Sequence, residues 1–360
     1  MKLYIALLLG LFLRVQTFPT NQHYEDFEDP NAVWPIPQRN GSILWMTEEK
    51  AMIEATLTEE LHQTTFKTNR SDKVRFFLYT QDNPTESVEI FLNDEESLMR
   101  SNFNANNPTR FVIHGWMTDH NSLFATREAL LLNGEERELN YISVDWSVYA
   151  ETINYISAKQ SCSKAGQKVA EFIDWLHDVA GLSFETLALY GHSLGAHVAG
   201  FTGKNVQRGR VHTIVGLDPA MPLFSYKKTE KRLCDTDAEY VETIQTNGGL
   251  LGFYKPIGQA SFYPNGGKHQ PGCGNDLTGS CSHGRSMAYF EEALTLGHRN
   301  GFTAVGCSDF ESLKIGNCNQ YGSVSRLGDP INAQFANGIY YLETNSESPY
   351  GRLIKYNKND

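Results

Sequence analysis

Strand-like and helix-like segments alternate along most of the chain, and this alternation constrains the fold more than any other feature. Runs rich in β-branched and aromatic residues predict strands, and they cover residues 74–80, 110–116, 141–146, 186–191, 211–218 and 338–344. Between them, residues 122–133 and 163–181 have apolar side chains at helical spacing. Strands separated by helices pair in parallel. The sequence therefore predicts an α/β fold with a mostly parallel central sheet and helices on both faces.

A Gly-x-Ser-x-Gly motif lies directly after the predicted strand 186–191. It runs from Gly191 to Gly195, and the small residues of a predicted helix follow it. Between a strand and a helix, this motif is the signature of a nucleophile elbow, a strained turn that exposes a serine. The two glycines remove Cβ atoms that would clash in so sharp a turn. Ser193 is the candidate nucleophile, at a helix N-terminus whose dipole favours the anion formed on attack.

A nucleophilic serine needs a histidine base, and that base needs an acid to hold its tautomer. In folds with this elbow the chain order is serine, acid, histidine. Asp218 ends the predicted strand 211–218, so we expect it beside the elbow as the acid. Asp235 and Asp237 lie in a polar loop, where carboxylates are usually solvated.

Three histidines follow Asp218 in the sequence. His283 stands just before a predicted helix and two residues after Cys281, so a cross-link there would anchor its loop. His269 lies in a loop rich in glycine and proline, and His298 lies near a helix end, where a cationic side chain suits the dipole. We assign the base to His283.

An oxyanion hole needs two converging N–H donors. One is expected from the backbone of Leu194, the residue after the nucleophile. The second is expected from the loop after an early strand, where Gly115 permits a turn and the Trp116 amide follows the strand 110–116. The alternative for Trp116 is a buried tryptophan without a catalytic role.

Charge and cysteine content exclude several function classes. The chain has 42 acidic and 31 basic residues, a formal net charge of −11, and no block of Lys and Arg. Nucleic acid is excluded as a main partner, because phosphate backbones bind to basic surfaces. The six cysteines form no CxxC pair that would indicate zinc or redox chemistry. We expect no metal and no cofactor.

The first 17 residues have the pattern of a secretory signal peptide. Lys2 precedes an apolar run over residues 3–13. That run is too short to span a bilayer, which needs about 20 residues, and no later segment is long enough, so we expect no transmembrane segment. The mature protein is expected to be secreted, with paired cysteines and with candidate glycosylation sites at Asn40 and Asn69.

Residues 18–61 are acidic and proline-bearing, with a short helical pattern over 48–60 as their only periodicity. We interpret them as an N-terminal extension or propeptide, and the alternative is a loosely packed arm that stays attached. The catalytic domain is then expected to cover residues 62–360.

Seven motifs, in one order along the chain, carry a family resemblance: VIHGW, VDWS, GHSLGAHVAG, GLDPA, TDAEYVETIQTNGG, FYPNGGKHQPGC and CSHGRS. Together they resemble the pancreatic-type neutral lipase family of animals, and closely its short secreted insect members, over about residues 70–345. The resemblance implies an α/β-hydrolase fold and a catalytic set that matches the residues chosen above: Ser193, Asp218 and His283 as the triad, and Trp116 and Leu194 as the oxyanion donors.

The resemblance also implies where this chain departs from larger family members. The lid disulfide of the family would join Cys273 to Cys281, which leaves a lid of seven residues with Leu277 as its one apolar member. So short a lid looks like the phospholipase A1 branch. The chain ends about 16 residues after the strand 338–344, so neither the C-terminal β-sandwich of the large lipases nor its partner colipase is expected.

Further cysteine and metal assignments follow from the same resemblance. Cys307 and Cys318 match a family disulfide near the C-terminus, and Cys162 and Cys234 are then paired by elimination only. Asp237 aligns with one carboxylate ligand of the family's calcium loop. Cys234 stands where another ligand would align, which argues against a bound calcium ion.

These observations predict a secreted serine carboxylic ester hydrolase that cleaves lipid esters at micelle or membrane surfaces through an acyl-enzyme. Triacylglycerol and phospholipid both remain candidate substrates, and phospholipase A1 activity as the main activity is the alternative. An alternative of another class is a catalytically silent, yolk-protein-like protein that binds or stores lipid. Such relatives lack the catalytic serine, whereas Ser193 is present with its partners.

Overall fold

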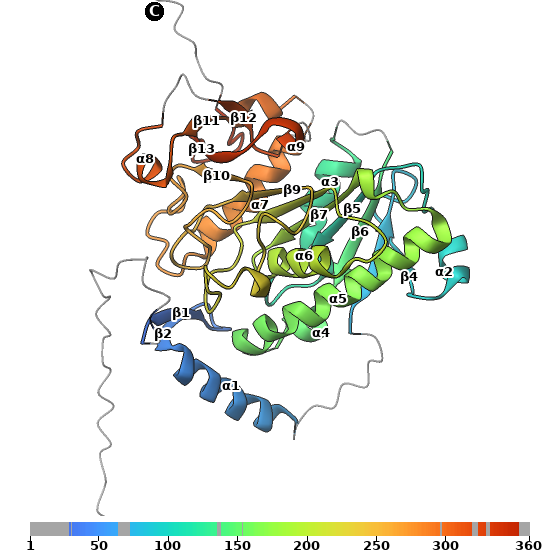
Figure 1. Cartoon of the computed structure of the whole chain (residues 1–360), viewed down its shortest axis with the longest axis horizontal. Helices are drawn as coiled ribbons and strands as arrows, with labels where there is room; N and C mark the ends of the chain where they lie inside the picture. The colour runs from blue at the N-terminus through green and yellow to red at the C-terminus, as the bar shows by residue number, and fades with distance from the viewer. Residues whose placement is uncertain are drawn as a thin grey trace, which may run out of the picture.

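A computed structural model describes residues 29, 31–63, 73–134, 138–152, 154–295, 297–318, 323–328 and 332–352 (Figure 1). The predicted signal peptide, residues 1–17, and the candidate glycosylation site Asn69 lie outside the described residues.

The described residues form a large mixed sheet and a separate hairpin. The large sheet consists of β3 Arg75–Tyr79, β4 Val88–Ile90, β5 Thr109–Ile113, β6 Asn140–Asp145, β7 Leu187–His192, β8 Thr213–Leu217, β9 Tyr240–Ile244, β10 Ala260–Pro264, β11 Thr303–Cys307, β12 Val324–Arg326 and β13 Gly338–Leu342. Their order is β12-β11-β13-β10-β9-β8-β7-β5-β6-β3-β4. The strands from β6 to β13 in this order pair in parallel, and the antiparallel pairs lie at the two edges. The predicted, mostly parallel sheet is confirmed.

Helices cover both faces of the sheet (Figure 1). They are α1 Glu48–Gln63, α2 Glu95–Met99, α3 Phe124–Leu131, α4 Ser147–Ala150, α5 Tyr155–Ala180, α6 Leu194–Asn205, α7 Ser280–Leu294, α8 Phe310–Lys314 and α9 Asn332–Phe335. Alternate residues of a strand point to opposite faces. Accordingly, Phe76 of β3 packs in the core beneath α5 and α6, whereas Phe77 packs in the core beneath α3 and α7. The predicted helix 163–181 forms the larger part of α5.

Residues 33–63 are ordered and pack on the domain, in a way that the sequence did not predict. β1 Val33–Pro37 and β2 Ile43–Thr47 form an antiparallel hairpin, and α1 covers the predicted helical stretch 48–60. Trp34, Ile36 and Met46 are buried in the same core as α5 and α6. We expected no strands here, because this acidic segment carries prolines and shows no alternation of apolar and polar residues. Proline is tolerated in a strand at a sheet edge, however, and both strands of an isolated hairpin are edges.

Two of the three expected disulfides are present. Cys273 is bonded to Cys281, with Cα atoms 5.7 Å apart, and Cys307 is bonded to Cys318, with Cα atoms 4.3 Å apart.

The third expected disulfide, between Cys162 and Cys234, is wrong, because both are buried free thiols. The Cys162 sulfur lies 3.8 Å from the carbonyl oxygen of Leu194, at the start of α6. The Cys234 sulfur lies 3.5 Å from the ammonium of Lys204, near the end of the same helix. Leu194 and Lys204 are ten positions apart along the helix, a rise of about 15 Å, whereas cysteines whose Cα atoms are more than about 7 Å apart cannot be bridged. Pairing by elimination carried no information about this distance.

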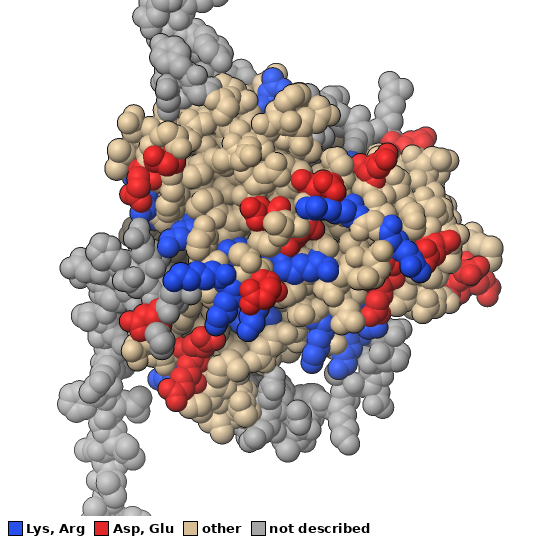
Figure 2. Space-filling model, in the orientation of Figure 1, with Lys and Arg blue, Asp and Glu red and all other residues tan. Residues whose placement is uncertain are grey.

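Two features of the described residues bear on membranes and nucleic acids. No helix among them is both long enough and apolar enough to cross a bilayer. On the face shown in Figure 2, Lys and Arg side chains lie among Asp and Glu side chains. This mixed distribution differs from the continuous basic surface typical of nucleic-acid binding.

Candidate active site

Ser193 lies in the sharp turn between β7 and α6, with φ 57° and ψ −120°. Few residues other than glycine adopt positive φ, and such strain is typical of functional turns. The turn is possible because two glycines, which have no Cβ, let the backbones around it approach closely. A Cβ on Gly195 would lie 2.3 Å from the carbonyl oxygen of Ile113, and one on Gly191 would lie 2.3 Å from the carbonyl oxygen of Gly195. The sequence motif therefore forms the predicted strand–turn–helix elbow.

Asp218 follows β8, and its side chain is fully buried. Its Oδ1 accepts hydrogen bonds from the backbone N–H groups of Thr246, at 2.7 Å, and Asn247, at 3.0 Å. Its Oδ2 lies 2.5 Å from Nδ1 of His283. These three contacts fix the orientation of the carboxylate toward the imidazole ring. The predicted acid and base are thus in direct contact across 65 positions of sequence.

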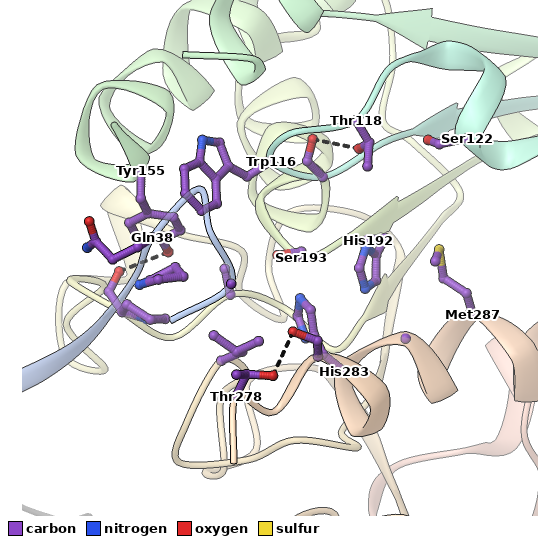
Figure 3. A pocket seen from close by; sticks show the side chains of 18 of the residues that line it. Gln38, Trp116, Thr118, Ser122, Tyr155, His192, Ser193, Thr278, His283 and Met287 are labelled. Carbon is purple, nitrogen blue, oxygen red and sulfur yellow. Dashed lines mark hydrogen bonds between the residues drawn. The ribbon is translucent and has the colours of Figure 1, made fainter. Parts of the chain in front are cut away.

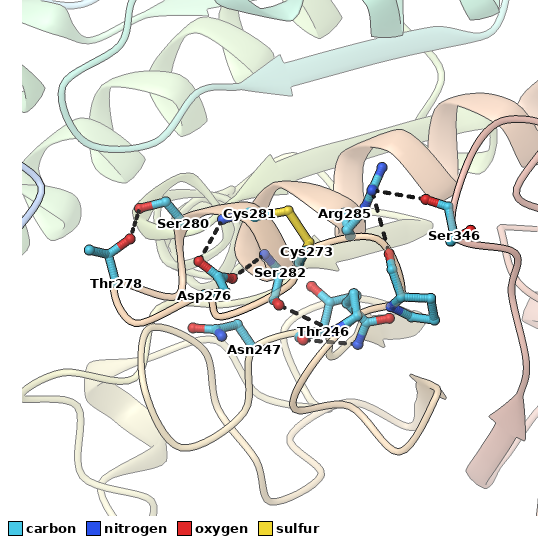
Figure 4. The surroundings of a disulfide bond; sticks show 12 residues. Thr246, Asn247, Cys273, Asp276, Thr278, Ser280, Cys281, Ser282, Arg285 and Ser346 are labelled. Atoms are coloured by element: carbon cyan, nitrogen blue, oxygen red, sulfur yellow. Dashed lines mark hydrogen bonds between the residues drawn. A yellow bond between two sulfur atoms is a disulfide. The ribbon is translucent and has the colours of Figure 1, made fainter. Parts of the chain in front are cut away.

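His283 lies in the first turn of α7. Figure 4 shows the disulfide-closed loop that leads into this helix. The Asp276 carboxylate accepts hydrogen bonds from the backbone N–H groups of Cys281, at 3.3 Å, and Ser282, at 2.7 Å. The N–H of His283 itself donates to the carbonyl oxygen of Gly279, at 2.8 Å. Residues of the disulfide-closed loop therefore hold the backbone of residues 281–283, and with it the position of the imidazole ring.

The other residues considered for the acid and base lie elsewhere. His269 is exposed, and His298 Nδ1 lies 3.8 Å from Glu292. Asp235 is exposed, as expected for a loop carboxylate. The same expectation was wrong for Asp237, which is buried and contacts Lys204. Among these four, none lines the pocket that contains Ser193 and His283.

Ser193 and His283 line one pocket of about 330 Å³ (Figure 3). This volume is within the range of small-molecule sites, about 300–1,000 Å³. Trp116 and Tyr155 line it on one side of Ser193, and Met287 lies on the other. The tip of the β1–β2 hairpin also lines it, a contribution that the sequence did not predict.

Of the two candidate oxyanion donors, Trp116 lines this pocket, and Leu194 directly follows Ser193, which also lines it. Leu194 is the first residue of α6, and N–H groups in a first helical turn have no acceptor within the helix. Trp116 lines the pocket, its indole N–H donates to the carbonyl oxygen of Thr152 at 3.1 Å, and its ring meets the edge of Tyr155. The indole is therefore held as a pocket wall next to the elbow.

Buried His114 supports the turn that contains Trp116, a role that the sequence did not reveal. Its Nε2 accepts from the backbone N–H of Trp146 at 3.2 Å, so its Nδ1 is the protonated nitrogen and donates to the carbonyl oxygen of Gly115 at 2.9 Å. The indole of Trp146 donates back to the His114 carbonyl oxygen at 2.8 Å. These bonds tie the turn to the end of β6.

Two more residues support the segments next to Asp218. His197 is fully buried, accepts from the Leu233 N–H at 3.0 Å, and donates to the Ala220 carbonyl oxygen at 2.7 Å. It therefore ties α6 to the loop after the acid, and burial lowers its pKa to about 3. A Cβ on Gly252 would lie 2.3 Å from Oδ1 of Asp218, so only glycine fits there. Spacing alone does not show either contact.

The residues around Asp237 do not fit a calcium ion. The ammonium of Lys204 contacts the Asp237 carboxylate and lies 3.0 Å from the carbonyl oxygen of Arg232. It also lies 3.5 Å from the Cys234 sulfur. Burial raises the pKa of Asp237, and the Lys204 charge opposes that effect. A side-chain cation thus already occupies the position where a metal would bind this carboxylate.

Comparisons with known proteins agree with this geometry. A family model described as "Lipase" matches residues 39–350. Pancreatic triacylglycerol lipase of Myocastor coypus is 32% identical, over 77% of this chain and 66% of that protein. Phospholipase A1 of Polybia paulista is 36% identical, over 61% and 71%, and lipoprotein lipase of Homo sapiens is 33% identical, over 77% and 63%. The chain thus spans about two thirds of the length of these relatives. It belongs to the lipase family, of the pancreatic type, and has an α/β-hydrolase fold.

Proposed function

We propose that this chain is a secreted serine carboxylic ester hydrolase that cleaves acyl esters of lipids through an acyl-enzyme. The observation that carries the proposal is the arrangement of Asp218, His283 and Ser193. The Asp218 carboxylate lies 2.5 Å from the His283 imidazole, and His283 and Ser193 line the same pocket. Two of the relatives are named as a triacylglycerol lipase and a phospholipase A1. Both names denote hydrolysis of lipid esters.

The proposed reaction has two stages. His283 takes the proton of Ser193 as its oxygen attacks the ester carbonyl, and Asp218 holds the Nδ1 proton and stabilises the imidazolium. The N–H groups of Leu194 and Trp116 bind the oxyanion of the tetrahedral intermediate. The intermediate collapses, the alcohol leaves with the proton from His283, and an acyl-serine remains. Water activated by His283 then releases the fatty acid and restores Ser193.

The short lid supports phospholipid as well as triacylglycerol as substrate. The segment between Cys273 and Cys281 forms no helix of its own, apart from Ser280 at the start of α7. Leu277 is 69% exposed and is the one apolar residue of this loop. A charged head group entering the cleft therefore meets no apolar cover that would have to desolvate it. The same observation supports the alternative, in which phospholipase A1 activity is the main activity.

Secretion and surface binding are part of the proposal. The two disulfides are consistent with an oxidising compartment. Asn40 is exposed at the turn of the β1–β2 hairpin, where a glycan would not disturb the core. The substrates are expected to be lipid esters in micelles or membranes, hydrolysed without colipase.

A labelling experiment followed by a substrate comparison tests the proposal. A fluorophosphonate probe should label the purified protein but not the Ser193→Ala variant. Triolein, phosphatidylcholine and short p-nitrophenyl esters, assayed in parallel, should show hydrolysis that the same substitution abolishes. A folded protein that binds lipid but neither reacts with the probe nor cleaves any ester would support the storage-protein alternative instead.

A further inference from the structure

The tip of the β1–β2 hairpin lies at the candidate active site, although it is far from Ser193 in sequence. Pro37, Gln38, Gly41 and Ile43 line the same pocket as Ser193. Figure 3 shows Gln38 on the same side of Ser193 as Trp116 and Tyr155. The hairpin therefore contributes one wall of the pocket.

The pairing of the hairpin explains which side chains face the pocket. Pro37 pairs with Ile43, and Ile36 pairs with Leu44. Directly paired residues share a face of the ladder, and successive residues alternate between faces. Ile36 faces the protein core and is 2% exposed, so Pro37 and Ile43 share the opposite face, toward the pocket.

The hairpin is a fixed part of the domain. At its tip, the N–H of Gln38 donates to the carbonyl oxygen of Ser42 at 2.8 Å, and the Asn40 side chain accepts from the Ser42 N–H at 3.0 Å. At its base, Ala51 and Ala55 of α1 are buried in the core. The pocket beside Ser193 stays open with the hairpin in place, so the hairpin lines the site and does not plug it.

The chemistry of this wall suits a hydrocarbon chain. Pro37 and Ile43 offer carbon to the pocket, and Trp116 and Tyr155 lie on the same side of Ser193. An acyl chain gains from contact with such surfaces, whereas a polar head group would lose its hydration there. The lid, the usual place to look for such a surface, offers Leu277 alone.

We propose that the end of the β1–β2 hairpin, chiefly Ile43 with Pro37, forms the wall against which the acyl chain binds and sets the preference for acyl-chain length. This inference rests on the proposed ester hydrolysis. It makes residues 33–47 part of the substrate site, so their removal would not activate the enzyme.

The test compares esters of different chain length. For Ile43→Trp, the ratio of kcat/KM on a p-nitrophenyl ester with a twelve-carbon acyl chain to kcat/KM on the four-carbon ester should fall at least tenfold below the wild-type ratio. Leu44→Trp is the matched control, because Leu44 pairs with Ile36 on the face of the hairpin opposite to Ile43, is nevertheless 40% exposed, and does not line the pocket. It should leave the ratio unchanged. If Ile43→Trp does not fold, Ile43→Ala should lower the same ratio about tenfold through lost contact.

A binding measurement separates this inference from the proposed function. In the Ser193→Ala background, a dansyl-labelled long-chain fatty acid should bind about tenfold more weakly when Ile43 is replaced by Trp, and as before when Leu44 is replaced. If wild type cleaves no ester, the proposed function fails and this measurement alone decides the role of the hairpin. Equal effects of the two substitutions, or none from Ile43→Trp, would overturn the assignment of the acyl wall.

Discussion

Replacing Lys204 with Met should destabilise the protein by about 3–5 kcal/mol, the usual cost of breaking a buried ion pair by removing one partner. The side chain of Asp237 is only 2% exposed, and that of Lys204 is 21% exposed. Methionine retains most of the aliphatic volume but leaves the Asp237 carboxylate without its cation. The carboxylate would keep the N–H of Cys234, at 2.9 Å, as a hydrogen-bond donor.

The loss should depend on pH in a defined direction. Burial already raises the pKa of Asp237, and the Lys204 charge opposes that rise. Without the ammonium, the folded-state pKa moves further above the unfolded value of about 3.9. A carboxyl group with a raised folded-state pKa binds more protons when folded, so stability falls as pH rises through that pKa. The deficit of Lys204→Met should therefore be larger at pH 8 than at pH 5.

Urea unfolding followed by tryptophan fluorescence gives the measurement. The expected loss corresponds to a midpoint lowered by roughly 1–2 M. Lys168→Met is the control, since Lys168 pairs with Glu171 on the surface, where an ion pair contributes about 0–1 kcal/mol. A Lys204→Met variant within 1 kcal/mol of wild type would refute the reasoning. So would a wild-type protein whose activity and melting temperature fall in EDTA and recover with calcium, because the site would then hold a metal.

Three further predictions concern the triad, the lid and a buried histidine. Ser193→Ala and His283→Ala should each lower kcat by several orders of magnitude with unchanged melting temperatures. His269→Ala and His298→Ala should stay active. An inactive His269→Ala variant would show that His283 was wrongly assigned as the base. With so short a lid, the rate of hydrolysis of a short-chain triglyceride should rise smoothly as its concentration passes the solubility limit, and phosphatidylcholine vesicles should be cleaved. A sharp jump in rate at that limit without phospholipid cleavage would instead indicate a triacylglycerol lipase gated by a lid. His197, neutral in the fold with a pKa of about 3, should contribute stability that is complete above pH 6.5 and is lost at about 1.4 kcal/mol per pH unit toward pH 3; unfolding titrations of His197→Gln should show a pH dependence smaller by one proton.

The elbow was predictable because all of its determinants are local. β7, the turn and α6 are contiguous, and Gly191 and Gly195 are required by contacts within a few residues or with the adjacent strand. Asp218 and His283 were chosen by chain order and by their places at element ends, and the structure brings them into contact.

Predictions that needed a distance between remote segments were less successful. The pairing of Cys162 with Cys234 was wrong, because nothing in the sequence shows that their sulfurs contact opposite ends of α6. The hairpin over residues 33–47 was missed because its burial comes from tertiary packing into the core that it shares with α5 and α6, not from a periodic pattern. Its position at the pocket depends on the same packing.

A short lid and a hairpin wall have a joint consequence for how this enzyme would select substrates. A mobile lid couples selection to a conformational step, because the site is complete only after the lid opens at an interface. Here the loop before His283 is fixed by Asp276 and by the Cys273–Cys281 bond, and the hairpin is fixed by the core. If both walls are rigid, binding requires no ordering of either one, and chain-length preference should be the same for dissolved and aggregated esters. A preference that changed at the interface would mean that one of these walls moves.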